Sequence, residues 1–354
     1  MIHYLPANNR SKPTQPKQPK RGTPLMSQGL STRPVGTIRI FACGGGGINI
    51  GKEYLSFHEG HSADIANFEL ACIDTSDSNL DDRLIEKTWL FNDLDGSGKI
   101  RNSNDKTIAK AVPDILRKFK PADLNIVIFT ASGGTGSVAG PLILKQLLED
   151  GHVAVGVVTG SYESIKTAEN TIGTMKTLDA ISRAVNKPVV IQFGMNRPDV
   201  PRSAIDKEAH LMIASLAMLC SRRNHGLDTA DIKSFIFFNQ STDVPAQLAR
   251  IHVYDTIKGF EAKLKDPISV AYLKRDQDDL QPGVFAPYSC DGFMPSIAQS
   301  STSLFFGIEN HSFGDIRTEL EGLKKEMEMQ RKTRQQAVTF AADEDEVSDT
   351  GLIL

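Results

Sequence analysis

Several classes of protein are excluded by what this 354-residue sequence lacks. It has only four cysteines, Cys43, Cys72, Cys220 and Cys290, which lie far apart with no CxxC pair and no histidine cluster. Their spacing argues against a disulfide framework or a zinc site and fits a reducing compartment. No apolar run approaches the roughly 18 residues that a membrane-spanning helix needs, and we find no signal-peptide core. We therefore expect no metal site and no membrane partner.

A strong basic charge is also missing. The formal net charge of -3 at pH 7 argues against bulk binding of nucleic acid by the folded body. The P-loop pattern GxxxxGK[ST] is absent, because the segment Gly96–Ile100 has neither its spacing nor its hydroxyl. A dinucleotide-binding pattern, GxGxxA, can be placed on Gly134–Ala139, but there it follows the fourth strand rather than the first. Because the pattern itself is present, an NAD-dependent dehydrogenase stays an alternative.

The most informative stretch is the glycine-rich loop at residues 130–140, TASGGTGSVAG. It follows an apolar run at residues 125–129 that predicts a buried strand, and it precedes a helical pattern at residues 141–148. Glycines let backbone amides approach an anion closely, and the helix end adds partial positive charge. The stretch predicts a phosphate cradle made by Gly133, Gly134, Thr135, Gly136 and Ser137.

A second glycine-rich turn follows the first predicted strand, at residues 37–42. Its members predict another anion-binding nest, although a tight turn that lets the next helix pack would use the same residues. They are Gly44, Gly45, Gly46, Gly47 and Asn49.

Three further polar positions follow predicted strands, and each has two interpretations. Asp74 either holds a Mg²⁺ water or a ribose hydroxyl, or caps the next turn. Gly98 and Lys99 belong to a basic loop in which Lys99 or Arg101 either faces a γ-phosphate or is simply solvated. Glu163 either meets a sugar hydroxyl or caps a helix.

The order of elements predicts an α/β fold. Strands alternate with helices across residues 37–193, which is typical of a doubly wound parallel sheet whose ligands bind at the carboxyl ends of its strands. A helix at residues 203–220 is apolar along much of its length and should be buried between two domains. Strands at 247–254, 268–273 and 303–308 then predict a smaller α+β domain.

We accordingly predict five segments. Residues 1–35 hold six basic residues and no acid and should form a disordered basic arm, with Met1 or Met26 as its start. The nucleotide-binding domain covers 36–200, and the central helix and its turn cover 201–226. The second domain, 227–336, ends in a long helix. In the acidic tail, 337–354, the acid-then-apolar run at 343–354 has the pattern of a docking tag.

The combination of motifs resembles the tubulin/FtsZ superfamily over about residues 36–335. The loop at 132–138 is similar to the signature GGGTGSG, with Ser132 for its first glycine and Val138 for its last. The turn after the central helix is similar to the FtsZ pattern NxDxxD, with Asp228 and Asp231 kept and Gly226 in place of the asparagine. Within the superfamily, the run at 163–181, the turn at 224–226 and the acidic tail most resemble the bacteriophage tubulins (PhuZ).

This resemblance implies a GTPase that polymerises head to tail. GTP or GDP, with Mg²⁺ held mainly through phosphates and water, would lie under the glycine-rich loops of one subunit. Asp206 would contact the base, and Asp228 and Asp231 of the next subunit would be catalytic, although the same D-x-x-D pattern is also that of a helix cap. The tail would dock on the neighbouring subunit. Such filaments position phage DNA, capsids or a nucleus-like compartment in the cytoplasm of the infected bacterium. A nucleotide-binding structural protein without turnover remains a further alternative.

Overall fold

The computed structural model describes residues 34–58, 65–197, 199–276, 279, 281–295, 302–309 and 313–336. The predicted basic arm, apart from its last two residues, and the acidic tail lie outside this part of the chain. No helix of the described residues is both long enough and apolar enough to cross a membrane.

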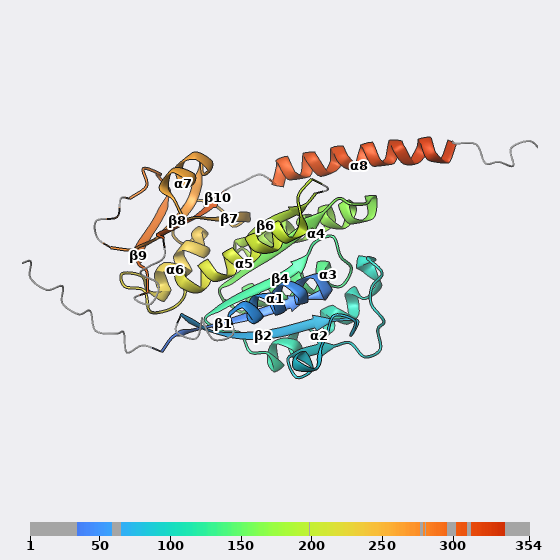
Figure 1. Ribbon diagram of the computed structural model, residues 1–354, viewed down its shortest axis with the longest axis horizontal. Coiled ribbons are helices and arrows are strands. Elements are labelled where there is room, and N and C mark those ends of the chain that lie inside the picture. Colours follow the sequence, from blue (N-terminus) through green and yellow to red (C-terminus); the bar gives the residue numbers. More distant parts are fainter. Residues whose placement is uncertain are drawn as a thin grey trace, which may run out of the picture. The chain divides into compact units, whose positions relative to one another are not determined.

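Ten strands form one continuous sheet in the order β3-β2-β1-β4-β5-β6-β7-β10-β8-β9 (Figure 1). The seven strands from β3 to β7 are parallel, β10 is antiparallel to both of its neighbours, and β8 and β9 are parallel. The bounds are β1 (Gly36–Cys43), β2 (Ala66–Asp74), β3 (Thr88–Leu90), β4 (Leu124–Thr130), β5 (Ala154–Ser161), β6 (Val189–Asn196), β7 (Leu248–Tyr254), β8 (Pro267–Lys274), β9 (Tyr288–Phe293) and β10 (Leu304–Glu309).

Helices cover both faces of the parallel part. The chain steps from β1 to β2 in one direction and from β4 to β5 in the other, so right-handed crossovers place their helices on opposite faces. Accordingly α1 packs beside α5, while α2, α3 and α4 pack in a row. The bounds are α1 (Gly44–His58), α2 (Asp105–Lys118), α3 (Gly136–Glu149), α4 (Ile165–Val185), α5 (Arg202–Leu219), α6 (Thr229–Ile236), α7 (Ile257–Lys263) and α8 (Phe313–Gln336).

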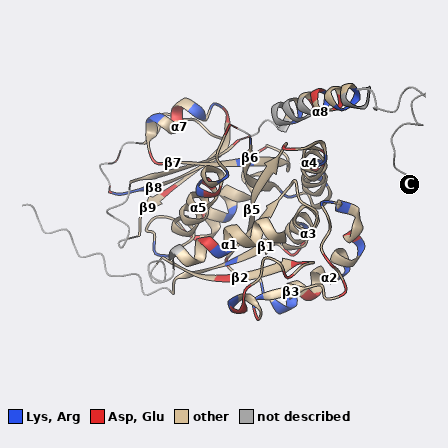
Figure 2. Ribbon diagram, turned by 45° about the vertical axis from the view of Figure 1, so that its right-hand side comes forward, with Lys and Arg blue, Asp and Glu red and all other residues tan. Residues whose placement is uncertain are grey.

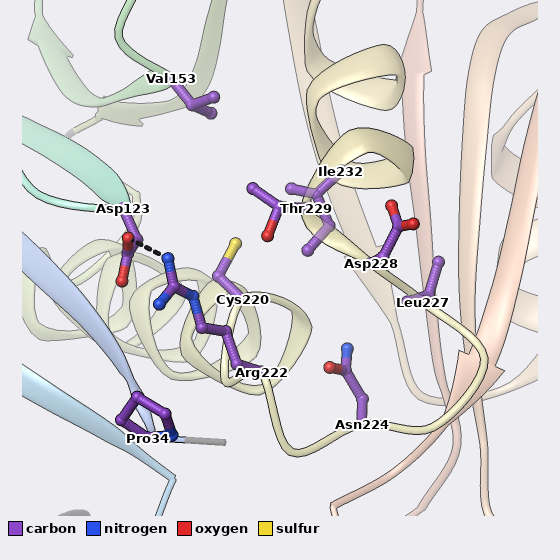
Figure 3. Close-up of a pocket in the computed structure, with 10 residues that line it drawn as sticks. All are labelled: Pro34, Asp123, Val153, Cys220, Arg222, Asn224, Leu227, Asp228, Thr229 and Ile232. Atoms are coloured by element: carbon purple, nitrogen blue, oxygen red, sulfur yellow. Dashed lines mark hydrogen bonds and ion pairs between the residues drawn. The ribbon is translucent and has the colours of Figure 1, made fainter.

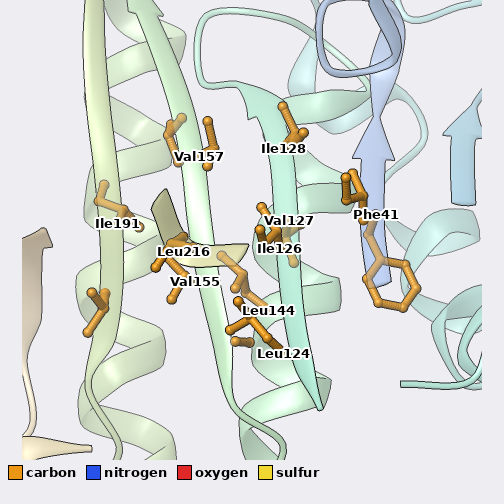
Figure 4. Close-up of a cluster of buried hydrophobic side chains, with 14 of the residues drawn as sticks. Phe41, Leu124, Ile126, Val127, Ile128, Leu144, Val155, Val157, Ile191 and Leu216 are labelled. Atoms are coloured by element: carbon orange, nitrogen blue, oxygen red, sulfur yellow. The ribbon is translucent and has the colours of Figure 1, made fainter. Parts of the chain in front are cut away.

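The central strands are buried on both faces. Ile126, Val127 and Ile128 of β4 are fully buried, with Leu144 of α3 and Leu216 of α5 among the side chains packed around the strands (Figure 4). Strands β4, β5 and β6 carry no charged residue, and the charges gather on the helices and loops (Figure 2). Two-sided burial explains why these strands appear in the sequence as continuous apolar runs.

The predicted doubly wound sheet is confirmed, and so are the long helices over 165–185 and 202–219. Two elements were not predicted, the strand β9 and the short helix α7. The sheet also runs without a break from β6 through β7 into the strands of the predicted second domain. The domain boundaries at 200, 226 and 336 therefore stay a prediction.

Candidate functional site

The two glycine-rich loops meet at the carboxyl edge of the parallel sheet. A Cβ on Gly44 would lie 2.7 Å from the Gly136 nitrogen, and a Cβ on Gly136 would lie 2.6 Å from the Cys43 carbonyl oxygen. Gly44 also has a φ of +71°, in the region that favours glycine. Only glycine at both positions lets the turn after β1 touch the start of α3, so the predicted anion-binding nests form one continuous surface.

A third loop, at residues 96–99, lies against the same surface. A Cβ on Gly134 would lie 2.5 Å from the Ser97 Cβ. The Thr135 hydroxyl is hydrogen-bonded to the Thr75 hydroxyl at 2.6 Å and to the Ser97 hydroxyl at 2.8 Å. Thr135 therefore joins the end of β2, the loop before α2 and the turn before α3.

The carbonyl groups at residues 132–134 are turned toward side chains that donate to them. The Ser137 hydroxyl donates to the Gly133 and Gly134 carbonyls, each at 2.8 Å. The Asn170 Nδ2 group on α4 donates to the Lys99, Ser132 and Gly133 carbonyls at 2.8, 3.1 and 3.2 Å. The Gly133 amide donates to the Thr130 carbonyl at 3.3 Å. Because the N–H of a trans peptide points away from its C=O, the Gly134 and Thr135 amides face away from the donors to the Gly133 and Gly134 carbonyls, as an anion cradle requires.

Arg101 adds a positive charge beside this cradle. Its Nη2 donates to the Ser137 carbonyl at 3.3 Å and to the Thr177 hydroxyl at 3.2 Å, and its Nε has no hydrogen-bond partner among the described residues. Burial lowers the pKa of its guanidinium. Sequence reasoning named Arg101, with Lys99, as a side chain that could face a γ-phosphate, but it did not predict the bonds to Ser137 and Thr177. It missed Asn170, because nothing local distinguishes a buried asparagine before its partners are known.

Asp74 is turned into the protein at the end of β2. It is 4% exposed, and its carboxylate accepts the Thr75 amide at 2.8 Å. Burial raises the pKa of Asp74 to about 6. This geometry supports the turn-capping interpretation, in which Asp74 fixes Thr75 for its bond to Thr135. No group of three or more His, Cys, Asp and Glu side chains gathers as a cation site in the described part of the chain.

The other predicted binding residues lie around the start of α5. Glu163 follows β5 and accepts from the guanidinium of Arg202, with its Oε1 3.1 Å from the Arg202 Nε. Asp206 lies one turn further along α5, where burial and the nearby Glu53 raise its pKa. Asn49 is exposed one turn before Glu53 on α1. The α1–α5 contact thus groups these polar side chains at one location.

Asp228 and Asp231 form the first turn of α6. The Asp228 Oδ1 accepts the Ala230 and Asp231 amides at 2.7 and 2.9 Å, and the Asp231 Oδ2 accepts the Asp228 amide at 3.1 Å. This reciprocal pair is a capping box, so both carboxylates are held in fixed positions.

Both acids lie far from the glycine-rich loops. Asp228 lines a cavity of about 200 Å³ together with Pro34, Asp123 and Val153, which precede β1, β4 and β5 (Figure 3). These residues mark the amino edge of the sheet. A strand of eight residues such as β1 spans about 26 Å, so one chain holds its cradle and its acid pair on opposite edges.

The motifs and the geometry agree with comparisons to known proteins. The profile of the Tubulin/FtsZ family, GTPase domain, matches residues 37–192. A phage tubulin-like protein of Pseudomonas phage PhiPA3 is 33% identical over 240 residues, which cover 67% of this chain and 73% of that protein. The chain belongs to the tubulin/FtsZ family.

Further relatives place this family member near the phage tubulins. The phage tubulin-like protein of Pseudomonas phage phiKZ is 28% identical over 89% of this chain and 97% of that protein. A solved protofilament of TubZ from bacteriophage PhiKZ has a TM-score of 0.78 at 29% identity, over 90% of this chain and 99% of that one. The matched GTPase domain contains Gly134–Ala139, which favours the phosphate-cradle interpretation over the dinucleotide one. Membership implies a domain that binds GTP or GDP.

Proposed function

We propose that this tubulin-like chain hydrolyses GTP at a head-to-tail contact between two copies. One copy holds the nucleotide at its carboxyl edge, and the next copy brings Asp228 and Asp231 from its amino edge. The observation that carries this proposal is the separation of the cradle and the acid pair onto opposite edges of one sheet. The solved TubZ structure is a protofilament, which supports self-association of this chain as well.

The residues present fit a triphosphate. Glycines at 44, 134 and 136 leave no room for a Cβ, the Gly134 and Thr135 amides face away from the donors to the loop carbonyls, and Arg101 places a positive charge beside the loop. Phosphoryl transfer to water depends mainly on positioning and charge neutralisation. Mg²⁺ would be held through the phosphates and water and would neutralise developing charge there. Asp206 and Glu163 would contact the base and the ribose.

The acid pair would orient the attacking water. Its carboxylates are fixed by the capping box, so no side-chain freedom is lost when they engage a neighbouring nucleotide. Two carboxylates near the γ-phosphate would polarise the water as general bases do. A cap and a catalytic pair are compatible here, because the cap uses Asp228 Oδ1 and Asp231 Oδ2 while each group has a second oxygen.

The biological setting is proposed from similarity to phage tubulin-like proteins. By that similarity the chain is phage-encoded, acts in the cytoplasm of the infected bacterium and positions phage DNA, capsids or a nucleus-like compartment. The tail at residues 343–354 would dock on the neighbouring copy, since its acids are followed by apolar residues.

Replacing Asp231 by alanine tests the proposal. We expect GTP binding to persist and phosphate release to fall by a factor on the order of 10² or more, equivalent to about 3 kcal/mol of barrier. The control is Asp179→Ala, which removes an exposed α4 carboxylate paired with Arg183. Phosphate release per chain should also rise with protein concentration in the unmodified protein. Turnover that is unchanged in the variant, or independent of concentration, would refute the shared site; no turnover at any concentration would favour a structural protein.

A further inference from the structure

The amino-edge cavity has an apolar wall and a polar floor. Val153, Leu227 and Ile232 line it beside Asp228 (Figure 3). Its floor is the ion pair of Arg222 and Asp123 with Asn224, which is 8% exposed and whose Oδ1 has no hydrogen-bond partner among the described residues. Cavities of this order accept a group as large as a benzene ring.

The floor of the cavity is rigidly held. Asp123 accepts the Thr37 amide at 2.9 Å as well as the Arg222 guanidinium, and the Ser221 carbonyl accepts the Gly36 amide at 3.0 Å. Further along, the His225 carbonyl accepts the Phe293 amide at 2.7 Å. The turn that carries Asp228 is therefore fixed to β1 and β4 on one side and to β9 on the other, so the cavity has a lasting shape.

An exposed apolar side chain lies at the opposite edge of the sheet. Ile100 is 54% exposed on the loop that touches the cradle. Its amide donates to the Ser97 carbonyl at 2.7 Å, and the preceding Lys99 has its carbonyl held by Asn170 and a φ of +60°. An isolated exposed isoleucine is ordinary, but this one is on a fixed loop beside an exposed lysine.

The proposed head-to-tail arrangement brings these two features together. It requires Asp228 of one copy to lie over the cradle of the next. The loop before Ile100 packs tightly on that cradle, since a Cβ added to Gly134 would lie 3.3 Å from the Lys99 backbone. The loop carrying Ile100 then faces the surface that contains Asp228 and its cavity. We infer that Ile100 of one copy inserts into the cavity lined by Val153, Leu227 and Ile232 of the next copy.

The charges agree with this placement, which rests on the proposed function. Lys99, adjacent to the isoleucine, would meet Asp228, which lines the cavity. Contact with a nucleotide-binding loop would make the strength of the filament contact depend on what the cradle holds.

Substitution of Ile100 tests the contact. Ile100→Ala should raise the critical concentration for assembly by roughly 10-fold or more, and Ile100→Asp should abolish assembly, while GTP binding by the monomer persists in both. The matched control is Ile85→Asp, since Ile85 is 63% exposed and follows the part of the β2–β3 connection that contacts the cradle through Thr75 and Asn79. Normal assembly of Ile100→Asp, measured by light scattering, would overturn the inference.

A cysteine pair separates this inference from the proposed function. Filaments of an Ile100→Cys, Thr229→Cys double variant should give a ladder of disulfide-linked oligomers under mild oxidation. Ile85→Cys, Thr229→Cys should give none. Both variants are made in a Cys220→Ala background, because Cys220 lines the same cavity, and the other three native cysteines are buried. If no ladder forms and Asp231→Ala is still inactive, the proposed insertion of Ile100 is wrong, but the proposed active site shared between copies is supported. If a ladder forms and Asp231→Ala is fully active, the insertion of Ile100 is supported and the catalytic role of Asp231 is excluded.

Discussion

Asp74 is a buried carboxyl group whose ionisation opposes folding. Its pKa is raised from 3.8 to about 6, chiefly by burial, against a smaller opposite effect of the hydrogen bonds from the Thr75 and Ser76 amides. A pKa that is higher in the folded state gives a stability contribution that is full below pH 3.8 and is lost as the pH rises through 6. A shift of this size corresponds to about 3 kcal/mol.

We therefore expect Asp74→Asn to stabilise the protein near pH 7.5, by at most about 3 kcal/mol. Asparagine keeps an oxygen that can accept the Thr75 amide, but it carries no charge to bury. The advantage over the unmodified protein should shrink as the pH falls from 6 toward 4. Urea unfolding at several pH values measures it, and a stability difference that did not change with pH would contradict the assignment.

The sequence could predict the glycines of the cradle but not the side chains that hold it. Glycine, threonine and serine form one contiguous motif at residues 133–137, so their chemistry is visible locally. Asn170 reaches carbonyls that are 71, 38 and 37 positions away in the chain, and Arg101 reaches Ser137 and Thr177. Such contacts depend on how α4 packs, which no local pattern contains.

At the scale of elements, helix α6 combines a cap with the proposed catalytic pair. The sequence allowed both a capping and a catalytic interpretation of Asp228 and Asp231, and the structure shows the cap. Capping needs an acceptor oxygen, whereas orienting a water as a base needs the negative charge. The two roles can therefore be separated by substitution.

Asp228→Asn should keep the cap and lose turnover, whereas Asp228→Ala should lose both. Asparagine is as good an N-cap residue as aspartate, and alanine at this position costs about 1 kcal/mol. Denaturant unfolding measures the first effect, and phosphate release at a concentration that supports filaments measures the second. An asparagine variant with normal turnover would show that the charge of Asp228 is not needed.

Strands with two buried faces were predicted well, whereas the edge strand β9 and the short helix α7 were not. Strands β4, β5 and β6 are uninterrupted apolar runs, because helices cover both of their faces. Strand β9, YSCDGF, lies at the edge of the sheet with alternating exposed residues, and α7 has only seven residues. Neither has enough apolar periodicity to stand out from a loop.

At the scale of the whole molecule, the sheet connects the regions that the sequence divided. The change of pattern after residue 226 suggested a separate domain, but β7 continues the parallel sheet and β10 then reverses direction beside it. Strand pairing over such separations is not encoded in local periodicity. The domain boundaries therefore remain a prediction, and so do the segments at 1–35 and 337–354, which the described residues do not test beyond Pro34 and Val35.

Removing residues 343–354 should weaken assembly without changing the nucleotide site. The segment holds acidic residues followed by Leu352, Ile353 and Leu354, and it lies outside the described part of the chain. If it docks on a neighbouring copy, its loss should raise the critical concentration measured by light scattering, while GTP binding by the monomer stays the same. A scrambled tail of equal composition is the control, and an unaltered critical concentration would exclude the docking role.

The placement of cradle and acids on opposite edges has an arithmetic consequence for short assemblies. If the acids act on a neighbour's nucleotide as proposed, only n − 1 nucleotides in a row of n copies would meet them, so the outermost copy at one tip would keep its triphosphate intact. Hydrolysis per chain would be half its limiting value in a dimer and would approach that value as the row lengthens. The intact nucleotide would always lie at the same tip, so the two ends of a growing filament would differ in the nucleotide that they hold.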